Sequence, residues 1–496
     1  MRVKLNLVLV ATLAGIMPAM AGAPAIQITS DPTSNMSCTA GVCTSTAANA
    51  VLNVNDLENM LASSDVSLRT AAGAQNIEIQ VPLTWASSSR LTLDANYNVA
   101  VKAAVTVAGT AGLTIVTNDG STGGDLIFTD TGNVSFWDVN SSLIINGLSY
   151  VLANSVAGLA SAIAAHPSVH FALASDYDAS PDGRYKGAPI TDLEGTFEGL
   201  GHEITGLRVR SRNPAGLFLS VGDRAIVRDV HLENVEIYGS GKYGIAGGIA
   251  GQSQGVIMSS SVQGLIKAKG TYDEAGGIVG SAAGMVVGCS TSGQVRARYS
   301  AGGIVGWNYA TIRTSHSDAA VNSDSVGGGI AGINYYGTVD QSFATGPVTA
   351  SGAGGIVGDQ RDGQISNSYA TGAIVSQGGT AGGIAAFVGY RGDGATATVA
   401  MSYSTASVRG TIAGGVLGAD VQNGRGNQNL YWDLDTSGIS DPSQGAGSPQ
   451  DDPGITGLTD GQLKSGLPAG FDQAIWGQKK KINGGYPYLL ANPPPK

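Results

Sequence analysis

Between residues 201 and 426, short apolar runs alternate with Gly, Ser, Asn and Asp, and the alternation is periodic. A unit of Gly-Gly, two apolar residues and, in most copies, another Gly occurs seven times, at spacings of 29, 26, 26, 26, 28 and 32 residues. The second glycines of the seven copies are Gly248, Gly277, Gly303, Gly329, Gly355, Gly383 and Gly415. A second element, Ser followed by an aromatic residue, Ala, Thr and Gly, comes after some copies, as at 342–346 and 368–372. Fixed periods of this kind are typical of repeat architectures.

The length of the repeat predicts its fold. Each period holds about three short runs of β-prone residues, and no window has the 3.6-residue periodicity of an amphipathic helix, which argues against helical repeats. About 26 residues are too few for a four-stranded propeller blade, which takes ~40, but they suffice for one coil of a solenoid. We therefore expect an all-β, right-handed parallel β-helix with Ile, Val and Leu inside and coils ~4.8 Å apart. The seven repeat glycines, at 248–415, are expected to let the backbone turn at the corners.

The rest of the chain predicts a second stretch and two covered ends. Residues 76–150 contain runs that alternate apolar and polar positions with a period of two, which indicates more β-helix. Between the stretches, 151–200 is expected to be a linker with a short helix at 155–164, capped by Ser155, and a strand at 170–174. The ends of a β-helix are open sheet edges, so 22–75 and 427–496 are expected to cap one continuous rod.

The first residues indicate export. Arg2 and Lys4 precede an apolar run from 5 to 17 and a small-residue site at 19–21, a pattern typical of a secretory signal peptide over 1–21. The protein is therefore expected to be secreted or displayed at the cell surface. Loss of this segment would move the formal net charge from −10 to about −12. Such an acidic chain is not expected to bind nucleic acid or anionic lipid.

The three cysteines fit an exported chain. Cys38 and Cys43 are close in sequence, and no further Cys pair or His cluster would complete a zinc shell. In an oxidising compartment this spacing favours a disulfide over a metal site. Cys289 lies in an apolar repeat segment and is expected to be a buried small hydrophobe.

Two motifs in and around the repeats have catalytic counterparts in other proteins. Residues 251–255 fit the G-x-S-x-G pattern of a nucleophile elbow, but they occupy the turn of a repeat with no helix after it, so a structural role is favoured. Catalytic β-helices need carboxylates stacked on neighbouring coils, whereas Asp324, Asp359 and Asp362 hold no common position relative to the repeat glycines. No catalytic residue is therefore assigned.

The only cofactor suggested by the sequence is calcium. Asp433, Asp435 and Ser437 supply oxygen atoms at alternate positions before Gly438, like the opening of a calcium loop. The twelfth position is Gln444 instead of a bidentate carboxylate. A weak calcium site and a hydrated turn therefore both remain as interpretations.

Aromatic residues recur in the repeats at positions that we expect to be exposed. They could stack on sugars or on a host protein, or they could pack between coils at half-exposed positions. These residues are Tyr299, Trp307, Tyr309, Tyr335, Tyr336, Tyr369 and Tyr403.

Taken together, the Gly-Gly unit and the Ser-aromatic-Ala-Thr-Gly element resemble the GLUG repeat of large bacterial surface proteins. The period-two stretch at 76–150 resembles filamentous-haemagglutinin-type adhesins. The resemblance implies an adhesin-like or structural passenger that acts by multivalent contact with host or matrix glycans or proteins, with an outer-membrane exporter as a further partner. Two alternatives stay open: a carbohydrate-active lyase or hydrolase of β-helix fold, and a passenger associated with a peptidase.

Overall fold

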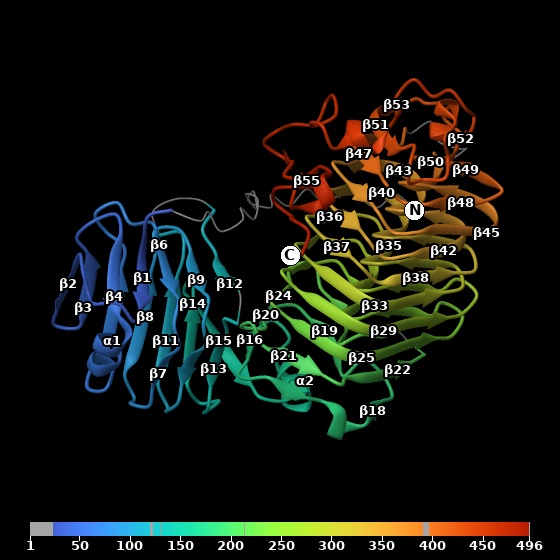
Figure 1. Ribbon diagram of the computed structural model, residues 1–496. Helices are drawn as coiled ribbons and strands as arrows, with labels where there is room; N and C mark the ends of the chain where they lie inside the picture. The colour runs from blue at the N-terminus through green and yellow to red at the C-terminus, as the bar shows by residue number, and fades with distance from the viewer. Residues whose placement is uncertain (1–22, 120–122, 130, 213, 390–395, 496) are drawn as a thin grey trace. The chain divides into compact units, whose positions relative to one another are not determined.

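The computed structural model describes residues 23–119, 123–129, 131–212, 214–389 and 396–495, so the expected signal peptide at 1–21 lies outside the described residues. Strands hold 51% of the chain and helices 7%, and the strands form about 16 solenoid coils (Figure 1). The predicted parallel β-helix is confirmed. The chain divides into two compact units, Met1–Leu152 and Ala153–Lys496. Among the described residues, no helix has the length and apolar character needed to cross a membrane.

Unit 1 contains three stacks of mainly parallel strands. The first stack holds, in spatial order, β12 (Leu126–Phe128), β9 (Val99–Val101), β6 (Asn76–Ile79), β1 (Ala25–Thr29) and β4 (Ala50–Asn53). The second holds β13 (Val134–Phe136), β10 (Val105–Val107) and β7 (Leu83–Trp85). The third contains β14 (Ser142–Ile145), β11 (Gly112–Val116), β8 (Arg90–Asp94) and β5 (Val66–Arg69). Leu91, Leu113 and Leu143 share one register and are buried, because every second side chain of a strand points inward.

The segment 22–75, expected as a cap, contributes both a coil and a cover. Its strand β1 pairs in parallel with β4 and β6, so it lies within the stack. Helix α1 (Val54–Leu61) contacts β7, at the edge of the second stack, and buries Leu57 and Leu61. The antiparallel hairpin of β2 (Met36–Thr39) and β3 (Val42–Ser45) adds to the edge of β5, and a disulfide joins its opposed residues Cys38 and Cys43. The structure thus forms the disulfide that the spacing predicted.

Unit 2 begins with the segment expected to be a linker. Helix α2 (Val156–Ala165) is capped by Ser155, whose Oγ accepts a hydrogen bond from the Gly158 amide at 3.1 Å. The helix packs on β19 (Ile190–Leu193) and buries Val156, Leu159 and Ile163 in the core of the unit. Strand β16 (His170–Leu173) pairs in parallel with β20 (Thr196–Glu198). The predicted helix and strand are therefore present, and the helix packs in the core of unit 2.

Each repeat forms one coil of unit 2. A representative coil contains four strands, one more than the number of apolar runs predicted: β30 (Glu274–Gly276), β31 (Val279–Ala282), β32 (Val286–Val287) and β33 (Ser290–Ala297). They pair in parallel with the next coil, in β34 (Ser300–Gly302), β35 (Val305–Asn308), β36 (Thr311–Arg313) and β38 (Ala320–Ser323). Ile278 and Ile304, from the repeat motif, are fully buried, so the apolar positions of the motif build the core.

The repeat glycines lie at bends between strands, as expected. The reason that these positions require glycine, however, differs from the one expected. None of the seven has a φ in the left-handed range, so the bend itself does not demand glycine. Instead, a Cβ added to Gly303 would lie 2.0 Å from the carbonyl oxygen of Gly329 on the next coil. Gly277, Gly329 and Gly355 approach the next repeat glycine in the same way, at 2.1 to 2.2 Å. Close stacking of coils, and not the turn, therefore requires these glycines.

Cys289 belongs to a buried ladder of serines. The Cys289 amide donates to the Ser315 hydroxyl at 3.1 Å, and the Ser315 amide donates to the Ser342 hydroxyl at 3.2 Å. The Ser342 amide continues the ladder to Ser368. Burial raises the pKa of the Cys289 thiol to about 12. The prediction that Cys289 is a buried small hydrophobe is confirmed in its burial.

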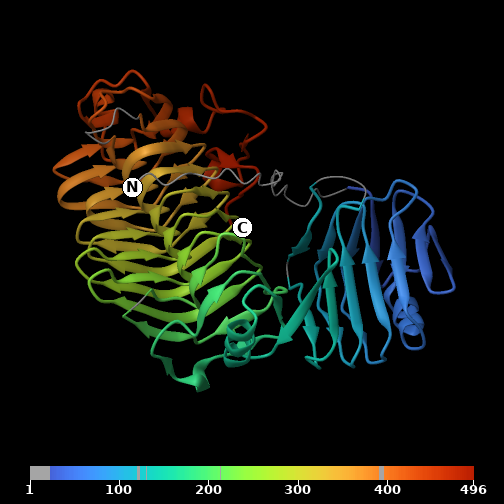
Figure 2. The same ribbon diagram turned by 180° about the vertical axis from the view of Figure 1, so that it is seen from behind.

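The C-terminal segment caps the core and then runs back along the coils. Trp432, in β51 (Asn427–Asp433), is fully buried and closes the core at this end. From there the chain returns across earlier coils, and Asn492 donates to the carbonyl oxygens of Ser315 at 3.1 Å and Gln341 at 3.2 Å. Both views show β55 (Tyr488–Leu489) lying against the coils of unit 2 (Figures 1 and 2). The predicted C-terminal cap thus also covers one side of the solenoid.

Candidate functional site

Seven aromatic rings form a continuous line on unit 2. Successive ring centroids lie 4.4 to 6.1 Å apart. Four of the rings are between 44% and 57% exposed, and the other three are half-buried. We call this line the aromatic strip, and its members are Tyr243, Tyr272, Tyr299, Trp307, Tyr309, Tyr335 and Tyr336.

The strip follows from stacking of the repeats. Tyr243, Tyr272 and Tyr299 lie on three successive coils, each just before the strand that leads into the Gly-Gly bend. These strands are β26 (Ile245–Gly247), β30 and β34, respectively. Parallel coils bring such positions together, and the line then continues through Trp307 on β35 and Tyr335 on β40 (Ala331–Asp340). Five of the seven rings were among the aromatics expected to be exposed. Tyr243 and Tyr272 were missed, although each stands four residues before the first glycine of its repeat.

Charged groups lie beside the strip. The Arg361 guanidinium lies 5.4 Å from the centre of the Trp307 ring and pairs with Asp359 at 2.9 Å. Burial raises the pKa of Glu274 to about 7, against a hydrogen bond with Ser281 that lowers it. The strip therefore combines apolar faces with a cation and with a carboxyl group that titrates near neutral pH.

Glu274 and Asp359 do not form a carboxylate pair. The register runs from Glu274 through Ser300 and Val326 to Gly352, so Asp359 lies three coils further on. At ~4.8 Å per coil this is roughly 14 Å along the axis, beyond the 5 to 10 Å that separates the two carboxyl groups of a glycosidase. Among the strands that the structure describes, no register places two carboxylates of the repeats on neighbouring coils.

The prediction that Tyr369 and Tyr403 are exposed is wrong. They form a second line with Phe343, with centroids 4.9 and 5.2 Å apart, and both tyrosines are fully buried. The C-terminal segment covers this line: Trp476 packs on both tyrosines, and the Tyr403 hydroxyl donates to the carbonyl oxygen of Pro487 at 2.6 Å. For these two residues, the interpretation as structural packing holds.

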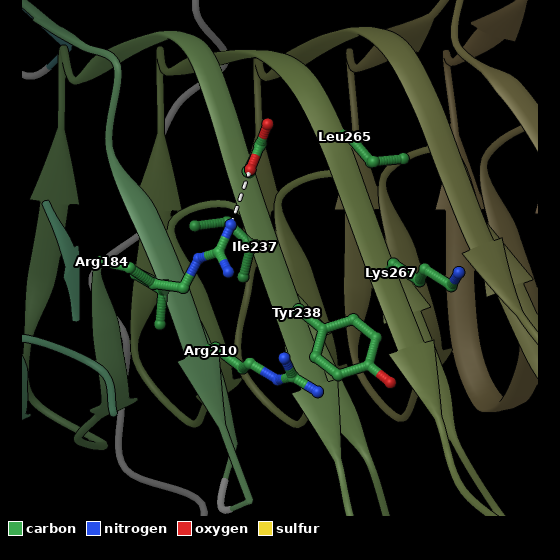
Figure 3. Close-up of a pocket in the computed structure, with 8 residues that line it drawn as sticks. Arg184, Arg210, Ile237, Tyr238, Leu265 and Lys267 are labelled. Carbon is green, nitrogen blue, oxygen red and sulfur yellow. Dashed lines mark ion pairs between the residues drawn. The ribbon is translucent and has the colours of Figure 1, made fainter. Parts of the chain in front are cut away.

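A groove on another part of unit 2 was not expected from the sequence (Figure 3). It has a volume of about 250 Å³ and crosses β22 (Arg208–Ser211), β25 (His231–Ser240) and β29 (Ser261–Lys269). The Arg210 guanidinium lies 5.0 Å from the centre of the Tyr238 ring, and the Lys267 side chain lies on the neighbouring strand. At the other end of the groove, Arg184 pairs with Glu236 at 3.5 Å.

A second groove of about 340 Å³ continues the same surface, and Lys267 lines both grooves. Together the grooves are lined by six cationic side chains and by two carboxylates, Glu236 and Asp324. We call the six cations the basic face: Arg184, Arg210, Lys267, Lys269, Arg296 and Arg298. The sequence carried a signal for this surface, because cations alternate with small or apolar residues at 208–212, 267–269 and 296–298, which places them on one face of a strand.

The other sequence candidates serve the fold. Ser253 of the G-x-S-x-G pattern is 2% exposed, and its hydroxyl contacts the carbonyl oxygen of Gly255. Asp359 and Asp362 lie on opposite faces of β43 (Val357–Ser366), with Asp362 buried. Neither position offers an exposed nucleophile or a convergent pair of acids.

The residues of the possible calcium loop lie in a hydrogen-bonded turn. Asp433 is fully buried, and its two oxygens accept from the Asp435 amide and the Tyr486 hydroxyl, both at 2.9 Å. Asp435 accepts from the Asp460 amide at 2.8 Å, and the Ser437 hydroxyl donates to a backbone carbonyl. Within the described ranges there is no group of three or more His, Cys, Asp or Glu side chains placed to hold a metal ion. Calcium binding by Asp433, Asp435 and Ser437 stays a prediction.

Comparison with known proteins adds little to this geometry. No protein-family model and no curated protein matches the sequence. One solved structure, described as a "putative immunoglobulin A1 protease" from Bacteroides ovatus, aligns with 69% of this chain and 92% of its own. The identity is 19% and the TM-score is 0.38.

Proposed function

We propose that this chain is an exported, adhesin-like β-solenoid that binds glycans of a host or matrix surface through the aromatic strip. The observation that carries this proposal is the line of seven contacting rings, four of them about half exposed. Large apolar rings left in water are a hallmark of binding surfaces, and their flat faces suit the apolar faces of sugar rings. Because the rings recur from coil to coil, several weak contacts would add up to strong attachment.

The placement of the acidic side chains in the repeats supports glycan binding over glycan cleavage. Glu274 and Asp359, two carboxyl groups beside the strip, lie three coils apart. Asp273, the neighbour of Glu274, is buried, and its carboxylate accepts hydrogen bonds from backbone amides. Acid–base cleavage of a glycosidic bond requires two carboxyl groups, one on either side of it. The expected export agrees with the disulfide between Cys38 and Cys43, since such bonds persist in oxidising compartments. The proposal therefore ranks an adhesin above a carbohydrate-active enzyme.

The test uses the double variant Tyr272→Ala/Tyr309→Ala, which removes two exposed rings. Purified protein is passed over immobilised polysaccharides, and retention is measured together with release of reducing or unsaturated sugar ends. Truncation of two contact rings, at about 1 kcal/mol each, should weaken retention at least tenfold. Trp137→Ala is the matched control, because Trp137 is 74% exposed but lies in unit 1.

Three results would contradict the proposal. The first is equal retention of the double variant and the parent. The second is no retention of the parent on any glycan. The third is release of sugar ends, which would favour the enzyme alternative instead.

A further inference from the structure

We propose that the basic face and the aromatic strip together bind a linear acidic polysaccharide, with carboxylates along its length and with its chain parallel to the solenoid axis. This inference rests on the proposed glycan-binding function and names the class of glycan. It depends on four observations. Most cations of the basic face have no acidic partner, and some of them share one register on successive coils. Apolar side chains lie between them, and the basic face adjoins the aromatic strip.

Most cations of the basic face have no acidic partner. Arg184 pairs with Glu236, and Arg298 lies 3.5 Å from Asp324. Among the described residues, no carboxylate lies within ion-pair distance of Arg210, Lys267, Lys269 or Arg296. In a chain with a formal net charge of −10, four unpaired cations on one sheet are an uneven distribution that favours an anionic ligand.

The spacing of these cations fits a polymer. Arg210, Tyr238, Lys267 and Arg296 occupy one register on four successive coils. Coils repeat at ~4.8 Å, which is close to the length of one sugar in an extended chain. A uronate polymer, which carries one carboxylate per sugar, would therefore meet a cation or an aromatic ring at each coil.

The groove also offers apolar contact. Leu265 is 37% exposed and lines the first groove with Tyr238, whose ring lies beneath the Arg210 guanidinium. Sugar rings have apolar C–H faces as well as charged groups, so a surface with both kinds of contact suits a glycan better than a bare phosphate chain. Lys267 joins this platform to the second groove.

The basic face meets the aromatic strip at one corner of the coils. Arg298 directly precedes Tyr299, and the Lys242 ammonium lies 5.1 Å from the centre of the Tyr243 ring. The buried carboxylate of Asp273 fixes this corner, because it accepts hydrogen bonds from the amides of Arg298 and Tyr299 at 2.6 to 3.1 Å. Rings and cations are therefore held side by side on the same coils.

The experiment compares an anionic ligand with its uncharged ester. An oligogalacturonate and its methyl ester, equal in length, are titrated calorimetrically into the full-length protein at low and high salt. The parent should bind the acid at least tenfold more tightly than the ester at low salt. This preference should disappear at high salt, because exposed charges are screened.

Three variants assign the effect. Lys267→Gln/Lys269→Gln/Arg296→Gln should lose the preference for the acid and keep the affinity for the ester. The variant Lys267→Arg/Lys269→Arg, which keeps the charges, should retain the preference. The control Lys479→Gln/Lys480→Gln/Lys481→Gln removes the same charge from the exposed C-terminal segment and should bind like the parent.

The outcomes separate the two proposals. Equal binding of acid and ester, lost in Tyr272→Ala/Tyr309→Ala, would overturn the acidic class and leave glycan binding standing. If the parent binds neither ligand but is retained on other immobilised polysaccharides, this inference is overturned and the proposed glycan binding stands. Tighter binding of a single-stranded DNA oligonucleotide of equal charge would assign the basic face to nucleic acid and overturn this inference.

Discussion

The stacking role of the repeat glycines can be tested with one methyl group. Gly303→Ala places a Cβ 2.0 Å from the Gly329 carbonyl oxygen and 2.4 Å from the Ser317 hydroxyl, where an ordinary contact needs at least 3.4 Å. The coils would have to separate locally by more than 1 Å, because one of the two clashing groups is backbone. Overpacking costs about 1 to 3 kcal/mol. Two hydrogen bonds between the coils would also weaken, at about 1 kcal/mol each. In one, the Gly277 amide donates to the Gly303 carbonyl oxygen; in the other, the Gly303 amide donates to the Gly328 carbonyl oxygen, both at 3.1 Å.

The expected loss is therefore about 3 to 5 kcal/mol, measured as a shift of the denaturant midpoint by circular dichroism. Gly187→Ala is the control, because a Cβ at Gly187 would have no atom within 4 Å and its φ is not left-handed. It should change the stability by less than about 0.5 kcal/mol. If Gly303→Ala also shifts the stability by less than 1 kcal/mol, the coils can give way and the stacking argument fails.

Two further predictions concern buried titratable groups. Burial raises the pKa of Glu274 from 4.5 to about 7, so ionisation disfavours the folded state and stability should fall as pH rises from 4.5 to 7. Glu274→Gln should remove this loss, worth up to about 3 kcal/mol above pH 7, and identical pH profiles of variant and parent would refute it. Cys289→Ser should cost less than about 1 kcal/mol, because serines fill the equivalent ladder positions, whereas Cys289→Leu should cost about 2 kcal/mol by overpacking. Equal unfolding midpoints for the two Cys289 variants would show that the ladder does not restrict this position.

The repetition of the sequence made the architecture predictable. A 26-residue period with buried Ile residues such as Ile278 and Ile304 admits few folds other than a stacked coil, and the structure has that coil. The helix at α2 was equally local, because Ser155 caps it and three apolar residues at helical spacing bury one face. These features depend on neighbouring residues, so they could be read directly from the chain.

Features that depend on distant contacts could not be read in this way. Tyr369 and Tyr403 have the same motif context in the sequence, and their burial results from a segment that returns about 80 residues later, as the contact of Tyr403 with Pro487 shows. The insertion of β1 between β4 and β6 is a second case, because no periodicity specifies a strand that pairs with two later ones. The division into two units likewise depends on where α2 closes a core.

The net charge of the whole chain did not reveal the basic face. A formal net charge of −10 argued against nucleic acid and anionic lipid as partners of the chain as a whole, yet six cations gather on two adjoining grooves. In a solenoid, one residue type repeated at one register becomes a line of like groups on the surface, so local charge can oppose the net charge. Binding is governed by the electrostatic potential at the surface that the ligand contacts. For a repeat protein, this potential is better inferred from the charges that share one register on successive coils than from the pI of the whole chain.

The two aromatic lines of unit 2 show how the same stacking can serve two ends. Both arise because a ring recurs at one position of successive coils, and both would expose apolar surface if left alone. The C-terminal segment covers the line of Phe343, Tyr369 and Tyr403, and Trp476 packs over it. It leaves the line from Tyr243 to Tyr336 open, and it is this open line that adjoins Arg361, Glu274 and the basic face. Since covering segments are available to this fold, the open strip is better explained by a ligand that occupies it than by a lack of means to bury it.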